Sequence, residues 1–477
     1  MFDLKFDMSN LFGDINTYSE VLSVVNAKCT TVVEKFPAYE AIVDFFGRFK
    51  SRDKVEITME VVHSYSFRSD NPSDWQRNYQ SLMDDNDKSD EVIISVYIKK
   101  SFDHEEKITI FCFESFLGFY KSKSKSELIE MFSNLFEEHP SLYFEVMDDE
   151  VEIITQSIYF LDDNKNMSTG KWNRKNQLSK CRSASTYFNM DRFPLLPQDF
   201  HIVSEKYDNG ETIVNSFKEL ETIFSLVYLA NNSHLLDNQL LMCLLTGSKD
   251  LIFSLGEVTT NTVINELFYW GFDSDSYIER IGIIRNVLAD NCNTEDVLQG
   301  IGDDIFSSVK SNYMLFQKKI VEQYVEMKKQ ISTFIVDSTK QMQDIVQGIA
   351  DALKNNFIAV IMFLITVLIT DSVDWEDITS KNILNQDLVI IIKIFVLASA
   401  FYLVITLLAT VFKWRTLSLG YKDLKKNYSN VLDSNDLEIA FQKDVFLKRS
   451  RMRLIICSII VSIGWITFLI LVNSIIN

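Results

Sequence analysis

Two long apolar segments near the C-terminus constrain this chain more than any other feature. Leu388 to Phe412 has 25 residues with Lys393 as its only charge, and Leu454 to Ile476 has 23 residues with none. A helix needs about 20 apolar residues to cross a hydrocarbon layer about 30 Å thick. Both segments are therefore predicted to span a membrane.

A third, shorter apolar segment precedes them. Phe357 to Thr370 has 14 residues, which rise only about 21 Å as a helix. The loop 413–453 carries ten Lys and Arg, whereas 371–387 carries only Lys381. By the positive-inside rule, the first loop is cytoplasmic and the second lies across the membrane. Since the acidic start of the chain has no signal-peptide pattern, we expect a third crossing and a cytosolic N-terminal region.

Hydrophobic patterns before the spans predict an α+β region followed by helices. From Val55 to Phe67 apolar and polar residues alternate, as in a half-buried strand that includes His63 as a core histidine. Ser19 to Phe36 has a helical pattern, and the segment from Leu142 reads as a hairpin that turns at Asp148 and Asp149. After residue 197 there is no proline, which favours long helices.

The predicted fold is an α+β N-terminal cytosolic domain, a mainly α region with a long amphipathic helix, and a three-helix C-terminal transmembrane module. The amphipathic helix is either a coiled-coil stalk or packed on its own domain. The expected domains are an α+β domain 1–163, a polar basic linker or loop 164–210, an α-helical region 211–303, a stalk helix 304–356, and a membrane module 357–477 with spans at about 355–373, 388–412 and 454–476 and a cytoplasmic loop 413–453.

Charge and motifs argue against several classes of protein. Residues 1–353 carry a net charge of −22, so general nucleic acid binding is disfavoured. The six cysteines are far apart and the five histidines are scattered, which predicts neither disulfides nor a metal site. Without a phosphate-binding glycine motif, we predict no cofactor and no catalytic residue, and an enzyme is disfavoured.

A basic stretch between residues 164 and 190 contains no acidic residue before Asp191. It is either a solvated linker or a contact for a small anionic ligand or a cytosolic protein. The candidate contacts are Lys171, Trp172, Arg174, Lys175 and Arg182. A weaker polar cluster, Arg280, Arg285 and Asn286, lies on a predicted helix, where a solvated helix face is the simpler interpretation.

Small residues in the spans are spaced for close helix approach. They either pack the three helices of one chain or also form contacts in a homo-oligomer. These candidates are Ala398, Ser399, Thr406, Thr410, Ser458, Ser462 and Gly464, together with Trp465, which faces lipid or another helix. No charge is predicted near the middle of a span, which disfavours a transporter. Lys354 and Asp371 mark the ends of the first span and are the candidate coupling residues.

This layout is similar to that of membrane effectors of bacterial antiviral defence, although no motif indicates a family. The resemblance implies a cytosolic sensor that acts through a long helix on membrane helices in a bacterial inner membrane. The loop charges predict that the C-terminus lies outside. Two alternatives remain open. One is a passive membrane anchor or scaffold for a cytosolic partner, and the other is a membrane-bound enzyme whose site is not local in sequence.

Overall fold

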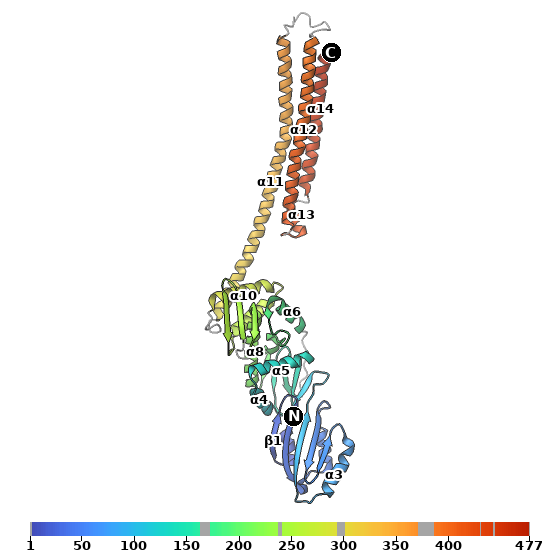
Figure 1. Cartoon of the computed structure of the whole chain (residues 1–477), viewed down its shortest axis with the longest axis vertical. Coiled ribbons are helices and arrows are strands. Elements are labelled where there is room, and N and C mark those ends of the chain that lie inside the picture. Colours follow the sequence, from blue (N-terminus) through green and yellow to red (C-terminus); the bar gives the residue numbers. More distant parts are fainter. Residues whose placement is uncertain are drawn as a thin grey trace. The chain divides into compact units, whose positions relative to one another are not determined.

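The computed structural model describes residues 2–162, 172–236, 241–292, 301–370, 386–429, 431–441 and 444–476. The chain forms two compact units, Met1–Leu315 and Phe316–Asn477. The predicted fold class is confirmed: three sheets precede a mainly helical region, and three long apolar helices follow (Figure 1).

The first sheet of unit 1 is antiparallel, with strand order β1-β2-β5-β3-β4. Its strands are β1 (Ile15–Glu20), β2 (Val24–Val32), β3 (Lys54–Glu60), β4 (Ser64–Arg68) and β5 (Glu91–Lys99). Alternating residues such as Val55, Ile57 and Met59 are buried, because successive side chains of a strand point to opposite faces. Three helices cover this apolar face: α1 (Leu4–Phe12), α2 (Tyr39–Phe46) and α3 (Trp75–Asp84). Short 3₁₀ turns occupy Val33–Lys35 and Pro72–Asp74.

The second sheet has strand order β11-β8-β9-β7-β6 and mixed direction. Its strands are β6 (Lys107–Ile110), β7 (Leu142–Val146), β8 (Glu152–Ile154), β9 (Ile158–Asp162) and β11 (Ser204–Lys206). The parallel pair β6 and β7 is connected through α4 (Phe113–Lys121) and α5 (Lys125–Glu138). A buried ion pair lies beside the start of α4: Lys100 Nζ is 2.7 Å from Glu20 Oε1, and Glu20 also accepts from the backbone N–H groups of Phe111 and Cys112.

The rest of unit 1 surrounds α8 (Glu211–Leu229), most of whose side chains are buried. A small sheet contains β10 (Thr186–Tyr187), β12 (Asn232–Leu235), β13 (Leu241–Thr246) and β14 (Asp250–Leu255). The other helices here are α6 (Arg174–Ala184), α7 (Pro197–Phe200), α9 (Thr262–Phe272) and α10 (Tyr277–Asn291). All of these elements share one hydrophobic core with the second sheet.

Unit 2 consists of helices, with α11 (Asp303–Thr370) beginning in unit 1. The others are α12 (Gln386–Tyr428), α13 (Ser434–Ala440) and α14 (Val445–Ile476). α11, α12 and the stretch that contains α14 are long and apolar enough to cross a membrane, which indicates a membrane-associated protein. Ile331 and Ile335 of α11 are buried against Tyr421 of α12 and Leu437 of α13. This part of the predicted amphipathic segment therefore packs within unit 2, and the described residues of unit 2 do not support the coiled-coil alternative.

Several sequence predictions differ from the structure in unit 1. Within the stretch 164–210, residues 174–206 fold as α6, β10, α7 and β11 and bury Cys181, Leu195 and Phe200 in the core, so they do not form a linker. The region 211–303 is not wholly helical, because β12, β13 and β14 lie within it. The remaining domain boundaries stay predictions.

Three local assignments are wrong. The helix predicted for Ser19–Phe36 is mainly strand β2, whose β-branched residues suit a pleated sheet. β7 and β8 do not form a hairpin, because β9 lies between them in the sheet. His63 is exposed in the turn between β3 and β4 and is not a core histidine.

Candidate functional site

The predicted cation contacts do not gather at one place. Arg174 forms a partly buried ion pair with Asp199, with Nη2 2.8 Å from Oδ2, and its guanidinium lies over the Phe136 ring. Trp172 packs partly buried against the core. Lys175 and Arg182 are exposed, and Arg182 pairs with exposed Asp191. Lys171 lies outside the described residues. Arg174 therefore stabilises the fold, and Lys175 and Arg182 remain candidates for partner contacts.

A polar pocket of about 500 Å³ lies between α6, α7 and the end of α9. It is lined by Gln177, Lys180, Gln198, Tyr269, Trp270, Phe272, Asp273, Ser274 and Asp275. Lys180 comes from the basic stretch, but the lining also contains two acidic residues. The Gln198 Oε1 atom is buried and has no hydrogen-bond partner among the described residues. This pocket can receive a ligand that carries both donors and acceptors.

A hydrogen-bonded group lies behind the Tyr269 wall of this pocket. The Tyr269 hydroxyl donates to Glu221 Oε1 at 2.8 Å, and His201 Nδ1 lies 2.7 Å from the same oxygen. The hydrogen bond to Glu221 raises the pKa of His201, whereas burial raises the pKa of Tyr269. Glu221 is on α8, so this group connects the pocket wall to the central helix of the unit.

Trp270 links the pocket to the first turns of α11. Its ring packs edge-on against Tyr313 at 5.4 Å and against Phe306 at 6.5 Å between centroids. The Arg280 guanidinium lies 4.7 Å from the Trp270 ring and 5.3 Å from the Tyr313 ring. Ile305 and Val309 of α11 are buried in the core of unit 1. A movement of the Trp270 side chain would therefore act directly on the first turns of α11.

The second polar cluster is also partly structural. Arg285 donates to the carbonyl oxygens of Ala184, Leu229 and Ala230, at 2.7 to 2.8 Å. These carbonyls close the C-termini of α6 and α8, where a cation is favourable. Burial lowers the pKa of Arg285 to about 10. Sequence alone carries no signal for this role, because the three acceptors are backbone atoms. Asn286 is exposed.

The membrane helices pack around Trp465. Its ring is 1% exposed and lies among Val360 of α11 and Leu469 and Val472 of α14. Trp465 therefore lodges against another helix rather than facing lipid. Its Nε1 atom has no hydrogen-bond partner among the described residues.

The other predicted packing residues divide by exposure. Ser399 and Thr410 are buried, and the Ser399 carbonyl accepts from Asn356 Nδ2 at 3.2 Å. Thr406, Ser458 and Ser462 are partly buried, whereas Ala398 and Gly464 are exposed. A homo-oligomer contact at the exposed positions stays a prediction. Of the coupling candidates, Lys354 is exposed on α11 and Asp371 lies outside the described residues.

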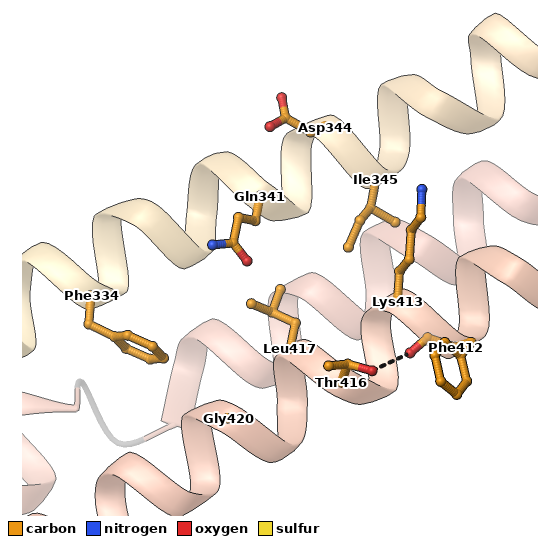
Figure 2. A pocket seen from close by; sticks show the side chains of 9 residues that line it. All are labelled: Phe334, Gln341, Asp344, Ile345, Phe412, Lys413, Thr416, Leu417 and Gly420. Atoms are coloured by element: carbon orange, nitrogen blue, oxygen red, sulfur yellow. Dashed lines mark hydrogen bonds between the residues drawn. The ribbon is translucent and has the colours of Figure 1, made fainter.

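A groove of about 630 Å³ lies between α11 and α12 at the end of the second apolar segment (Figure 2). It is lined by Phe334, Gln341, Asp344, Ile345, Phe412, Lys413, Thr416, Leu417 and Gly420. Figure 2 shows Asp344 directed away from α12, while the Lys413 side chain extends toward α11. The α11 wall of the groove includes Ile345, and Lys413 extends toward it from α12.

Comparisons with protein-family models, with curated proteins and with solved structures find no match in any of the three. Within the described ranges, no group of three His, Cys, Asp or Glu side chains is placed to hold a metal ion. The assignment of a candidate site therefore depends on the geometry of the pocket residues alone.

Proposed function

We propose that this protein is a membrane effector in which a ligand-sensing cytosolic unit acts through α11 on three membrane helices. The observation that carries the proposal is the position of Trp270, which lines the polar pocket and contacts Tyr313 of α11. The same helix continues to Thr370, so displacement at its start reaches the membrane without passing through a loop. A ligand needs only to prefer one position of Trp270 to shift the module.

Orientation, ligand and response belong to the same proposal. The positive-inside pattern supports a cytoplasmic N-terminus and a C-terminus on the other side of the membrane, and the similarity in layout to antiviral effectors supports a bacterial inner membrane. The mixed charges of the pocket favour a polar or zwitterionic ligand over a simple anion, because Asp273 and Asp275 lie near Lys180. The response of the module would be a leak across the membrane, as in antiviral effectors.

A helix break tests whether α11 carries the signal. Residues 314–323 are exposed along α11, so substitutions here disturb neither hydrophobic core. Replacing Lys318 by Gly and Lys319 by Pro should interrupt the helix, because proline costs about 3 kcal/mol in a helix interior. Replacing both by Ala is the matched control, and loss of the exposed Lys318–Glu322 pair affects both variants equally.

The readout is membrane potential and growth of bacteria that express each full-length chain at equal membrane levels. We expect depolarisation by the parental chain and the Ala-Ala variant, and its loss in the Gly-Pro variant. Equal depolarisation by all three would contradict signalling through α11. No depolarisation by the parental chain under any stimulus would favour the passive anchor instead.

A further inference from the structure

Three contacts fix the register of α11 against its neighbours in the membrane. Against α12, Phe363 stacks on Phe395 at 4.1 Å, and Asn356 donates to the Ser399 carbonyl. Against α14, Phe357 packs on Phe468 at 4.6 Å. α11 and α12 are antiparallel, since their residue numbers run in opposite directions through these contacts, while α11 and α14 run parallel.

With the apolar segments of α12 and α14 as predicted spans, this register places a polar part of α11 at membrane depth. Leu388–Phe412 of α12 lies beside about residues 345–369 of α11, and Leu454–Ile476 of α14 lies beside about residues 343–365. Lys354 therefore lies at about the depth of Trp465, the middle of the third apolar segment, about 15 Å from the level of Asp344. The apolar run of α11 taken alone places no charge near mid-membrane depth, whereas the register against α12 and α14 places Lys354 there.

The polar residues of this part form a stripe on one face. The stripe consists of Asp344, Gln347, Asp351, Lys354 and Asn355, and all five are exposed. At 3.6 residues per turn these five positions lie within about 100° of one another around the helix axis, so they share a face of the helix. Asp351 and Lys354 have no ion pair within the part of the chain that the structure describes.

At the same depth the other two helices present apolar side chains. Leu408 of α12 is 66% exposed, and Ile459 and Ile460 of α14 are 53% and 64% exposed. These side chains belong to the two apolar segments predicted to span the membrane, so we expect lipid around them. A charged residue at this depth costs about 2.5 to 3.5 kcal/mol on insertion scales, and such residues normally face a protein interior or a water-filled cavity.

We infer that the polar stripe is the face at which copies of this chain assemble around a water-filled path through the cytoplasmic half of the bilayer. The occupant of the stripe is a second copy, because the stripe is self-complementary: Asp351 and Lys354 have opposite charges one turn apart and can pair between neighbours. Gly348 lies on the same face, and a Cβ there would meet nothing within 4 Å, so a neighbouring backbone can approach closely.

The inference deepens the proposed function, since it names the path by which the module would leak. It is tested on the full chain in inverted native membranes, with Cys457 replaced by Ser. Gln347→Cys reports the stripe. Ile459→Cys is the matched control, because it lies at about the same depth on the apolar face of α14. The remaining five cysteines are buried in unit 1, and the parental background gives their baseline.

Both variants are treated with a membrane-impermeant maleimide and, separately, with an oxidant that forms disulfides between copies. We expect Gln347→Cys to be labelled roughly tenfold faster than Ile459→Cys and to cross-link into dimers, which Ile459→Cys does not. Equal labelling of the two variants would mean that all faces of the helices are in water at this depth. Labelling of Gln347→Cys without cross-links would mean that the stripe is in water but that copies do not assemble at it. Cross-links without labelling would mean that copies assemble at the stripe but leave no water there. If Gln347→Cys is neither labelled nor cross-linked, lipid or another protein covers the stripe. Each of these four results overturns the inference.

The two proposals fail separately. A wet, cross-linked stripe in a chain that never depolarises cells would leave the assembly standing and reject the effector function. Depolarisation by a chain whose stripe is neither wet nor cross-linked would keep the effector function and reject this path.

Discussion

The indole ring of Trp270 lies edge-on to the phenol ring of Tyr313, with centroids 5.4 Å apart and planes at 88°. Trp270 is a pocket residue on α9, and Tyr313 is on the helix that continues into the membrane module. The Arg280 guanidinium lies over both rings and so adds a cation–π interaction to the contact between them. An edge-to-face pair of this kind contributes about 0.5 to 1.5 kcal/mol beyond its buried area.

Removing the Tyr313 ring should loosen the start of α11. Tyr313→Ala loses the contacts with Trp270 and Arg280, so we expect faster amide hydrogen exchange across residues 303–315 in the full chain. Tyr313→Phe keeps the ring and should exchange like the parental chain. Unchanged exchange in Tyr313→Ala would show that the buried residues Ile305 and Val309 alone hold this part of the helix.

Arg285 should be among the most sensitive positions of unit 1. Arg285→Met leaves the three carbonyls of Ala184, Leu229 and Ala230 without their donor, and each unpaired buried group costs about 1 to 3 kcal/mol. We expect a loss of several kcal/mol in the free energy of unfolding, measured by urea denaturation in detergent. Arg182→Met is the control, because its ion pair with Asp191 is exposed and should contribute under about 1 kcal/mol. Similar losses in both variants would argue against the capping role.

The stability of unit 1 should depend on pH through Asp148. Burial raises the pKa of this carboxyl from its ordinary value of 3.8 to about 6, although its Oδ1 accepts from the Phe113 N–H. Below pH 3.8 the side chain is neutral in both the folded and the unfolded chain and costs nothing. Between pH 3.8 and about pH 6 the carboxyl ionises in the unfolded chain but stays protonated in the folded chain. The free energy of unfolding therefore falls as the pH rises through the folded pKa of about 6.

Asp148→Asn keeps the acceptor but cannot ionise. Relative to the parental chain, we expect the variant to gain on the order of 1 to 2 kcal/mol between pH 4 and pH 7.5, a value reduced because the side chain is partly exposed. Urea denaturation at both pH values measures it. A gain that is the same at both pH values would rule out the ionisation of Asp148 as the cause.

Patterns local in the sequence predicted the architecture well. Alternation over residues 55–67 identified the buried set that includes Val55, Ile57 and Met59, because a strand side chain is buried or exposed according to its parity. The helical spacing in Ser19–Phe36 gave a wrong prediction, because the β-branched residues of β2 pair with β5 in the sheet. In this segment the pairing between strands, and not the local pattern, determined the secondary structure.

The candidate site and the polar stripe depended on contacts that no local pattern encodes. Trp270 and Tyr313 belong to different helices, and the acceptors of Arg285 are backbone carbonyls. For Lys354, the apolar run from Phe357 predicted a boundary position, whereas the packing of Phe363 on Phe395 and of Phe357 on Phe468 sets its register against α12 and α14. Register between helices is a property of the packed module.

Trp465 should be the main packing residue of the membrane helices. Trp465→Ala removes the largest fully buried side chain among the described residues and leaves a cavity beside Val360 and Leu469. Such truncations cost about 3 to 5 kcal/mol in soluble cores, and we expect a clear fall in the melting temperature of the detergent-solubilised protein. Trp465→Phe should lose less, because the Nε1 atom has no partner to give up. Ile466→Ala, at a position 53% exposed, controls for volume lost on the lipid face, and an equal fall in that variant would contradict a core role for Trp465.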